Sequence, residues 1–337
     1  MINKIALAGC GNVGTAFLEL LHKKRALLDE KYGFKFEVTM VTDLMKGTVV
    51  DPNGIDLAAA LDMLHKKNSF KGFPQFDGSF VETLEKSEVT ILAEVTPTDL
   101  KTGEPGLSHI KAALSRGINV TMTNKGPVAV AADELQKLAE ECGAKLRYEG
   151  VVMSGTPLID MLRHGMAGCA IQKIEGILNG TTNYILSQMT NGMTYAEALE
   201  KATELGYAEA DPSGDVEGWD AAGKVAILAK IAFDKIIHVG DVKRTGITDV
   251  TPEKIKESLA AGYRVKLIAG LEVTPLGLYA YVQPKEIHIS HPLASVEGAT
   301  NAVTITTDNL GDVTLIGPGA GRTETAQALL TDVIAMA

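Results

Sequence analysis

The sequence has little that would support a disulfide framework, a membrane anchor or a secretory route. Its 337 residues include only three cysteines, Cys10, Cys142 and Cys169, and their spacing suits neither paired disulfides nor a zinc site. No apolar run reaches the roughly 18 residues that a membrane-spanning helix needs. The first residues lack the charged leader and cleavage site of a signal peptide, so we expect none. We therefore expect a cytoplasmic protein with no membrane partner.

Positive charge is also scarce. The chain carries 32 basic and 42 acidic residues, a formal net charge of -10, and the basic residues form no run. Nucleic-acid binding depends on clustered Lys and Arg, so we expect no nucleic-acid partner. Hydrophobic residues make up 45% of the chain and charged residues 22%, which permits a sizeable core and excludes global disorder. The length predicts two domains.

The first 150 residues predict alternating strands and helices. Short apolar runs predict strands at 4–8, 36–42, 89–95, 118–122 and 145–148. Helical periodicity predicts helices at 13–28, 107–116 and 131–142. Alternation of this kind predicts an α/β domain whose parallel sheet is covered by helices on both faces.

The pattern changes after residue 150. We predict a strand at 171–178, helices at 182–189, 194–205 and 216–233, and then strands at 266–273, 278–282 and 301–307. Strands around a cluster of helices predict an α+β domain over 151–310. The remaining segment, 311–337, predicts a strand end, a glycine turn and a helix that returns to the first domain.

A complete G-x-G-x-x-G motif lies between the first strand and the first helix. Gly9 permits a tight turn, Gly11 lets the backbone approach a pyrophosphate, and Gly14 lets helix and strand pack closely. The helix N-terminus adds free N–H groups for the anion. The motif therefore predicts a Rossmann-type doubly wound sheet that binds a dinucleotide, against the alternative of a glycine turn without a ligand. We interpret Cys10 as a small residue of this turn, since a reactive role would need a lowered pKa.

An acidic residue follows the second predicted strand. Asp43 there favours NAD, because a carboxylate at this place binds the ribose 2′-hydroxyl. Lys46 lies nearby and could instead meet the 2′-phosphate of NADP. A plain turn residue is the alternative for Asp43, and we favour NAD.

The predicted helix at 216–233 is apolar nearly all round, which is typical of a buried helix. We expect Asp211 or Asp215 to cap it, with Pro212 near its first turn. The helix carries few charges, and these are Glu217, Asp220, Lys224 and Lys230.

Asp220 and Lys224 stand four residues apart and share one face, with Glu217 on the same stripe. An ordinary solvated salt bridge is one interpretation. On a helix with so little polar surface, we favour charges that line a cleft. A lysine in a cleft can donate a proton, because burial readily shifts a lysine pKa. Carboxylates at Glu209 and Asp220 could hold a cationic group such as a substrate ammonium.

Longer motifs carry a family resemblance. They are GTTNYIL at 180–186, GYAEADP at 206–212, DVEGWDAAGK at 215–224, TNK at 123–125 and GAG at 319–321. Together they resemble homoserine dehydrogenase over nearly the whole chain. The resemblance implies reversible NAD(P)-dependent conversion of L-aspartate 4-semialdehyde into L-homoserine, in threonine and methionine biosynthesis.

The resemblance also implies residue roles. Lys224 would be the catalytic acid/base, Glu209, Asp220 and Gly206 would bind substrate, and Lys125 would line the site between substrate and cofactor. The cofactor contacts implied by the resemblance are Asn12, Val13, Thr96 and Gly319, in addition to the glycine loop and Asp43.

A sodium ion and a homodimer are further expectations from the resemblance. The sodium-binding stretch would supply Glu149, Val152, Ser154 and Thr156, and oxygen ligands of this kind suit a hard cation. Glu149 alone could equally be a strand-end carboxylate. The sheet of the second domain would form the dimer contact. Many family members carry a regulatory ACT domain or an aspartokinase fusion, and we expect neither here, nor threonine feedback through such a domain.

Two other functions stay open at this point. One is a different NAD(P)-dependent amino-acid or aldehyde dehydrogenase; its phosphorylating type would need a nucleophilic cysteine beside a base. The other is a non-catalytic NAD-binding sensor, which would not need Glu209, Asp220 and Lys224 together. The histidines, including His22, His65 and His109, show no ligand spacing and are not assigned to a site.

Overall fold

The computed structural model describes residues 2–337 and divides the chain into two compact units. The first unit runs to Gly155 and resumes at Gly321–Ala337, and the second unit is Thr156–Ala320. The sequence had predicted domain boundaries after residues 150 and 310. Within the described residues, no helix combines the length and the apolar character needed to cross a membrane.

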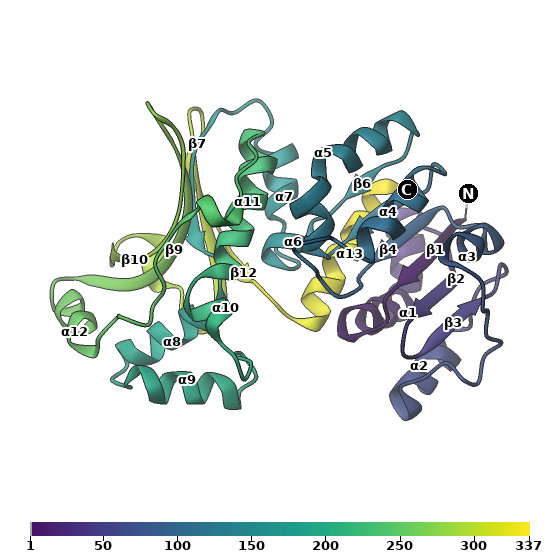
Figure 1. Ribbon diagram of the computed structural model, residues 1–337, viewed down its shortest axis with the longest axis horizontal. Helices are drawn as coiled ribbons and strands as arrows, with labels where there is room; N and C mark the ends of the chain where they lie inside the picture. The colour runs from purple at the N-terminus through teal and green to yellow at the C-terminus, as the bar shows by residue number, and fades with distance from the viewer. Residues whose placement is uncertain (1) are drawn as a thin grey trace. The chain divides into compact units, whose positions relative to one another are not determined.

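The first unit is built on a six-stranded sheet in the order β3-β2-β1-β4-β5-β6 (Figure 1). Its strands are β1 (Asn3–Ala8), β2 (Phe36–Asp43), β3 (Gly47–Val50), β4 (Ile91–Glu94), β5 (Asn119–Met122) and β6 (Leu146–Arg147). All neighbours pair in parallel except β2 and β3, which are antiparallel. The strand order reverses direction between β1 and β4, which is where open sheets of this kind bind their ligands.

Helices cover both faces of this sheet. They are α1 (Asn12–Tyr32), α2 (Leu57–Lys67), α3 (Phe80–Ser87), α4 (Gly106–Leu114), α5 (Lys125–Glu141), α6 (Gly150–Met153) and α13 (Arg322–Met336). One core joins α1, α2 and α13 to β1, β2 and β4, and it buries Phe17 and Leu7 completely. On the other face, α3 and α4 pack against the sheet, and Ser87 contacts Met40. The predicted doubly wound α/β fold is confirmed.

Several elements of this unit differ from the sequence prediction. The segment 47–87, for which we predicted no element, contains β3, α2 and α3. The helix predicted at 131–142 begins at Lys125, because Asn124 caps it by accepting a hydrogen bond from the Gly126 N–H at 3.0 Å. A kink at Ala131 marks the place where the sequence pattern had suggested a start.

The second unit is built on another six-stranded sheet, in the order β12-β11-β7-β9-β10-β8. Its strands are β7 (Ile171–Ile177), β8 (Lys243–Arg244), β9 (Tyr263–Thr274), β10 (Gly277–His288), β11 (Thr300–Thr307) and β12 (Gly311–Pro318). Neighbouring strands are antiparallel except β8, which pairs in parallel with β10. The α+β prediction for this part of the chain is confirmed.

The helices of the second unit pack mainly against β9, β10 and β11. They are α7 (Leu158–Asp160), α8 (Gly180–Thr190), α9 (Tyr195–Glu204), α10 (Ser213–Val216), α11 (Trp219–Phe233) and α12 (Pro252–Ala260), with short helical turns at Met161–Gly165, Val239–Asp241 and Pro292–Ser295. The predicted continuous helix at 216–233 was wrong in its first turn. Gly218 adopts a left-handed conformation (φ 84°) and separates α10 from α11.

This break changes the position of Glu217. The residue ends α10 and lies outside α11, so it does not share the stripe of Asp220 and Lys224 as we had predicted. Its carboxylate accepts a hydrogen bond from the Trp219 indole N–H at 3.1 Å instead. The expectation of a buried helix holds in part: seven of the fifteen residues of α11 are buried, and among the others only Trp219 is exposed.

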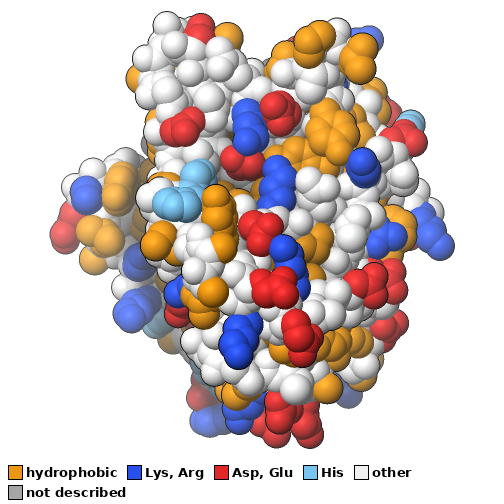
Figure 2. Space-filling model, turned by 90° about the vertical axis from the view of Figure 1, so that its left-hand side faces the viewer, with side chains coloured by type: hydrophobic (Ala, Val, Ile, Leu, Met, Phe, Trp, Pro, Cys, Tyr) orange, Lys and Arg blue, Asp and Glu red, His pale blue; other side chains and the backbone are white. Residues whose placement is uncertain are grey.

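A polar cluster lies on the face of the second sheet turned away from α11. Side chains alternate along β10, so Val282 lies against Gly218 at the start of α11 while Tyr281 points to the opposite face. The Tyr281 hydroxyl donates to Glu175 at 3.1 Å and accepts from Lys285 at 2.8 Å. Figure 2 shows the side where β9, β10 and α12 lie, with acidic and basic side chains alternating among apolar ones.

Candidate active site

The glycine loop has the geometry that a dinucleotide site requires. Gly9 has a φ of +93°, and a Cβ there would stand 2.8 Å from the Val95 carbonyl. A Cβ at Gly14 would stand 2.3 Å from the Gly9 oxygen, so helix and strand pack closely there. Gly11 has open space around it, and it precedes α1 without a capping side chain. The backbone at the α1 N-terminus is therefore accessible to an anion.

Asp43 and Lys46 both reach this loop from the end of β2. The Asp43 carboxylate accepts the Cys10 N–H at 2.8 Å and also the N–H groups of Met45 and Lys46 at 2.9 and 3.1 Å. The Lys46 ammonium donates to the Cys10 carbonyl. The two residues that we considered for cofactor selection thus lie together beside the glycine loop.

Cys10 itself is fully buried in the turn. Burial raises the pKa of its thiol to about 11, although a hydrogen bond with Thr15 partly opposes this effect. A thiol with a raised pKa is a poor nucleophile at neutral pH. The environment therefore argues against a phosphorylating dehydrogenase that would use Cys10.

Thr96 and Lys125 lie at the carboxyl ends of neighbouring strands. Thr96 follows β4, and Lys125 is the first residue of α5, directly after β5 and the Asn124 cap. Asn124 donates to the Thr96 hydroxyl at 3.3 Å. The predicted cofactor and substrate contacts of the first unit therefore gather at one edge of the sheet.

The stretch predicted to bind sodium is tightly held. Glu149 is buried, and its N–H donates to the Asp332 carboxylate at 3.2 Å. Ser154 has a φ of +53°, and its hydroxyl lies 2.8 Å from that of Thr325. Within the second unit, the Thr156 hydroxyl donates to the Pro318 carbonyl at 3.0 Å. Across residues 2–337, no three His, Cys, Asp or Glu side chains gather in a way suited to a metal, so a cation here would need carbonyl and hydroxyl oxygens beside any carboxylate from Glu149.

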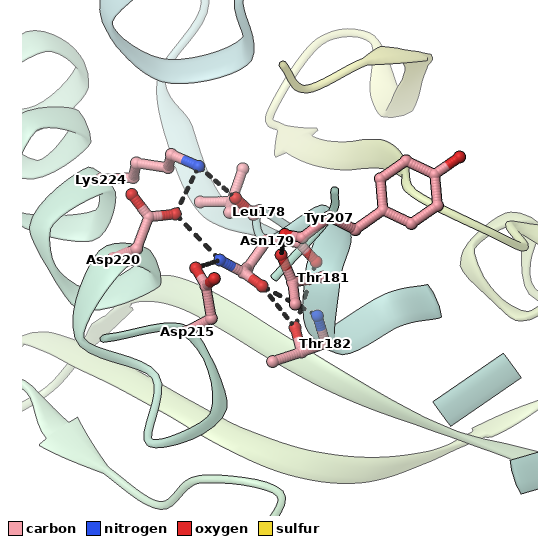
Figure 3. A network of polar contacts seen from close by, with 8 residues as sticks. All are labelled: Leu178, Asn179, Thr181, Thr182, Tyr207, Asp215, Asp220 and Lys224. Carbon is pink, nitrogen blue, oxygen red and sulfur yellow. Dashed lines mark hydrogen bonds and ion pairs between the residues drawn. The ribbon is translucent and has the colours of Figure 1, made fainter. Parts of the chain in front are cut away.

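Lys224 is buried at one end of a polar network in the second unit (Figure 3). Its ammonium donates to the Leu178 carbonyl at 2.6 Å and to the Asp220 carboxylate at 2.7 Å. Side-chain exposure is 7% for Lys224 and 25% for Asp220. The pair is therefore not the solvated surface salt bridge that the spacing alone would allow.

Asn179 connects this pair to the helices around it, and sequence reasoning had not assigned it. Its amide donates to Asp215 at 2.6 Å and to Asp220 at 3.1 Å, while its oxygen accepts the Thr182 N–H at 2.9 Å and caps α8 (Figure 3). Asn directly before a helix is a common cap, which was the available signal. Asp215, which we expected to cap a helix, instead bonds Asn179.

The structure leaves Glu209 and Gly206 apart from this network. Both lie on the exposed loop that follows α9. The loop is fastened by Thr181, whose hydroxyl donates to the Tyr207 carbonyl at 2.6 Å (Figure 3). Gly319, the next-to-last residue of the unit in sequence, packs on Asn301: an added Cβ would stand 2.0 Å from the amide carbon.

The mostly parallel sheet and its glycine loop place the protein among those with a Rossmann-type dinucleotide-binding unit. A family model described as homoserine dehydrogenase matches residues 157–334. The chain is 41% identical to an NAD(+)-dependent homoserine dehydrogenase from Pseudomonas canavaninivorans, over 98% of this chain and 95% of that protein. The chain therefore belongs to the homoserine dehydrogenase family.

Solved structures agree with this assignment. A putative homoserine dehydrogenase from Archaeoglobus fulgidus matches with a TM-score of 0.87 and 37% identity, over 99% of this chain and 98% of that one. A mutant of a hyperthermophilic archaeal homoserine dehydrogenase, solved in complex with NADPH, matches with a TM-score of 0.84 and 32% identity, over 100% and 98% of the two chains.

Proposed function

We propose that this protein is a homoserine dehydrogenase, which interconverts L-aspartate 4-semialdehyde and L-homoserine with NAD or NADP, in the route to threonine and methionine. The observation that carries the proposal is the buried Lys224, paired with Asp220 on α11, in a chain that belongs to this family. The accessible glycine loop supports a dinucleotide partner.

Lys224 is the proton donor and acceptor in this proposal. In the reductive direction, Nζ gives a proton to the aldehyde oxygen as that oxygen becomes a hydroxyl, and in the oxidative direction it takes the proton back. The positive charge also stabilises the oxygen while it carries negative charge. The nicotinamide, when bound, supplies or accepts the hydride at the carbon that bears this oxygen. The Leu178 carbonyl and Asp220 fix the direction of Nζ.

Substrate binding falls to Asp220, Glu209, Gly206 and Lys125. Carboxylates would hold the substrate ammonium, which orients the reacting carbon. Asp220 also bonds Lys224 and Asn179, so it would couple substrate binding to the position of the proton donor. Glu209 lies on an exposed loop, where it can meet a substrate that enters from solvent.

We propose that the cofactor is bound by the glycine loop and by residues at or just after the ends of strands of the first unit, with one residue from the second unit. These residues are Gly9, Gly11, Asn12, Val13, Gly14, Asp43, Thr96, Lys125 and Gly319. Asp43 supports NAD, and the NAD(+)-dependence of the Pseudomonas relative agrees with this preference. Lys46 at the same loop, and the NADPH bound by the archaeal neighbour, leave use of both cofactors open.

Three further features complete the proposal. A sodium ion would bind through Glu149, Val152, Ser154 and Thr156, because this tightly held stretch supplies hard oxygen donors. A homodimer would form through the second sheet, whose face in Figure 2 mixes charged and apolar side chains. The free thiols of Cys10, Cys142 and Cys169 suit the reducing cytoplasm.

The direct test is oxidation of L-homoserine, followed by the absorbance of the reduced cofactor, with NAD and NADP in parallel. We expect turnover with both and a higher kcat/KM with NAD. A chain that binds dinucleotide but does not oxidise homoserine would contradict the proposed activity. A strong preference for NADP would contradict the assignment of Asp43.

A further inference from the structure

Glu94 is a fully buried carboxylate at the point where the first sheet changes direction. It is the last residue of β4, and it pairs with Ala8, the last residue of β1. Ligands of doubly wound sheets bind outside the carboxyl ends of these two strands. Burying a carboxylate costs folding free energy unless hydrogen bonds or nearby charges compensate it. The contacts of Glu94 therefore indicate its role.

The carboxylate holds Thr96. Its Oε1 accepts the Thr96 N–H at 3.0 Å and also the Thr96 hydroxyl. From the other side, the Asn124 amide donates to the Thr96 hydroxyl and to the Pro97 carbonyl at 3.3 and 3.4 Å. Thr96 is thus fixed from β4 and from the start of α5 together.

The backbone that Glu94 holds lies directly against the glycine loop. A Cβ placed on Gly9 would stand 2.8 Å from the Val95 carbonyl carbon and 2.9 Å from the Thr96 nitrogen. Any displacement of Thr96 therefore changes the packing of the first glycine of the motif. Glu94 is thus linked to the glycine loop by two successive contacts: Glu94 with Thr96, and the backbone of Val95 and Thr96 with Gly9.

Two buried polar atoms beside this contact have no hydrogen-bond partner within residues 2–337. They are Glu94 Oε2 and His109 Nδ1. The His109 ring stacks on Phe80 with centroids 3.9 Å apart, and its Nδ1 lies 3.8 Å from Glu94 Oε1. Gly106 leaves the necessary room, since a Cβ there would stand 2.9 Å from Glu94 Oε2. Unsatisfied buried atoms in a well-packed unit point to a functional constraint.

We propose that Glu94 is a positioning residue for the dinucleotide: it fixes Thr96 against Gly9 of the glycine loop, while the His109 ring packs beside its carboxylate. The inference rests on the proposed function only in that a dinucleotide occupies the loop. A loop that is already ordered binds with a smaller entropic cost, so the effect belongs to cofactor affinity rather than to the chemical step.

The test is direct titration of the intact protein with NADH, followed by NADH fluorescence, so that turnover is not required. For Glu94→Ala we expect the Kd to rise by about tenfold, the scale of one lost hydrogen bond to a charged acceptor. For Glu94→Gln we expect a rise within about threefold, because the amide oxygen still accepts from Thr96 and the amide N–H can donate to His109 Nδ1. At saturating cofactor, kcat stays within about twofold of wild type in both variants.

Two more variants separate positioning from general loss of stability. His109→Phe keeps the stacking on Phe80 and removes a ring nitrogen that lies 3.8 Å from Glu94 Oε1 without a hydrogen bond, so we expect a Kd increase of at most about twofold. Leu84→Ala opens a cavity under α3 in the same unit and lowers the melting temperature, but we expect an unchanged Kd. A Kd that followed thermal stability across all four variants would overturn the proposal.

The remaining outcomes distinguish this inference from the proposed function. Equal NADH affinity of wild type and Glu94→Ala overturns the positioning role and leaves the dehydrogenase assignment intact. Normal NADH binding without homoserine oxidation overturns the activity and leaves the role of Glu94 standing. A wild type that binds neither NADH nor NADPH overturns both.

Discussion

Helix α11 carries two Lys–Asp pairs with the same spacing of four residues and very different surroundings. Asp220 and Lys224 near its start have side chains that are 25% and 7% exposed, and they bond Asn179 and the Leu178 carbonyl. Lys230 and Asp234 at its end are 23% and 87% exposed, and Asp234 already lies in the left-handed cap of the helix. Equal spacing in sequence thus gives one buried network and one surface ion pair.

The spacing of two charged residues in the sequence therefore shows only that they share a face of the helix. Neighbours from other elements decide whether the pair has a chemical use. For Lys224 they are the loop after β7 and the Asn179 cap of α8. Lys230 pairs with a carboxylate in open solvent, where ion pairs contribute little.

The largest expected effect is at Lys224. Lys224→Ala should lower kcat for homoserine oxidation by about 10²–10⁴-fold, the usual scale for loss of a general acid or base. Lys224→Arg should remain impaired, because a guanidinium keeps the charge but does not give up its proton. Steady-state rates at saturating substrate and cofactor measure this, and near-normal turnover of Lys224→Ala would remove the residue from the mechanism.

A smaller effect is expected at its partner. Asp220→Asn keeps the size of the side chain but removes the charge that directs the Lys224 ammonium. Misplacement of a reacting group by about 1 Å can cost up to 10²-fold, so we expect kcat/KM for homoserine to fall by about 10- to 100-fold. Asp234→Asn, at the C-cap of the same helix, is the matched control. If the two variants had equal kcat/KM, burial would not be what distinguishes the pairs.

Local patterns predicted the local geometry of those parts of the candidate site that lie within one turn or one helix. The glycine loop, Asp43 and the Asp220–Lys224 face all lie within short stretches of sequence, and the structure places them as the patterns indicate. The break at Gly218 was missed because a single glycine in an apolar run does not reveal its φ.

Residues that act through distant neighbours could not be predicted. Asn179 bonds Asp215 and Asp220 from 36 and 41 positions away. Glu94 lay within the strand predicted at 89–95, and His109 was not assigned to a site, because no sequence spacing links α4 to the end of β4. Only the folded sheet brings these groups together.

Lys266 is a second buried lysine, but unlike Lys224 it donates its hydrogen bonds to an amide oxygen and a backbone carbonyl. Its ammonium donates to the Asn183 side-chain oxygen at 3.1 Å and to the Val296 carbonyl. Burial lowers its pKa from 10.5 to about 8, and the charge of Glu297 offsets only part of this effect. Between these two pH values the unfolded chain keeps a proton that the folded protein has lost, so the Lys266 contribution to the free energy of unfolding rises with pH.

The measurement is the free energy of unfolding of wild type and Lys266→Met at several pH values. From pH 7.5 to 9.5 we expect the difference, wild type minus variant, to rise by about 2 kcal/mol. Subtraction removes the contributions of the other titrating groups. A difference that stayed flat, or fell, would show that the buried amine titrates near its ordinary value.

The smallest effect on activity and stability is expected at the surface pair Lys230–Asp234. This result decides whether the two pairs on α11 differ in function. Lys230→Ala removes a lysine from the same helix as Lys224→Ala and breaks a pair of the same spacing, so it controls for the loss of a lysine from this helix. Because solvent and salt screen the Asp234 carboxylate, we expect kcat within about twofold of wild type and a melting temperature lowered by no more than about 2 °C. Raising the ionic strength should shrink even that shift, since screening weakens exposed pairs first. A Lys230→Ala variant as inactive as Lys224→Ala would mean that the helix needs its lysines for folding. The loss of activity in Lys224→Ala would then be no evidence that Lys224 transfers a proton.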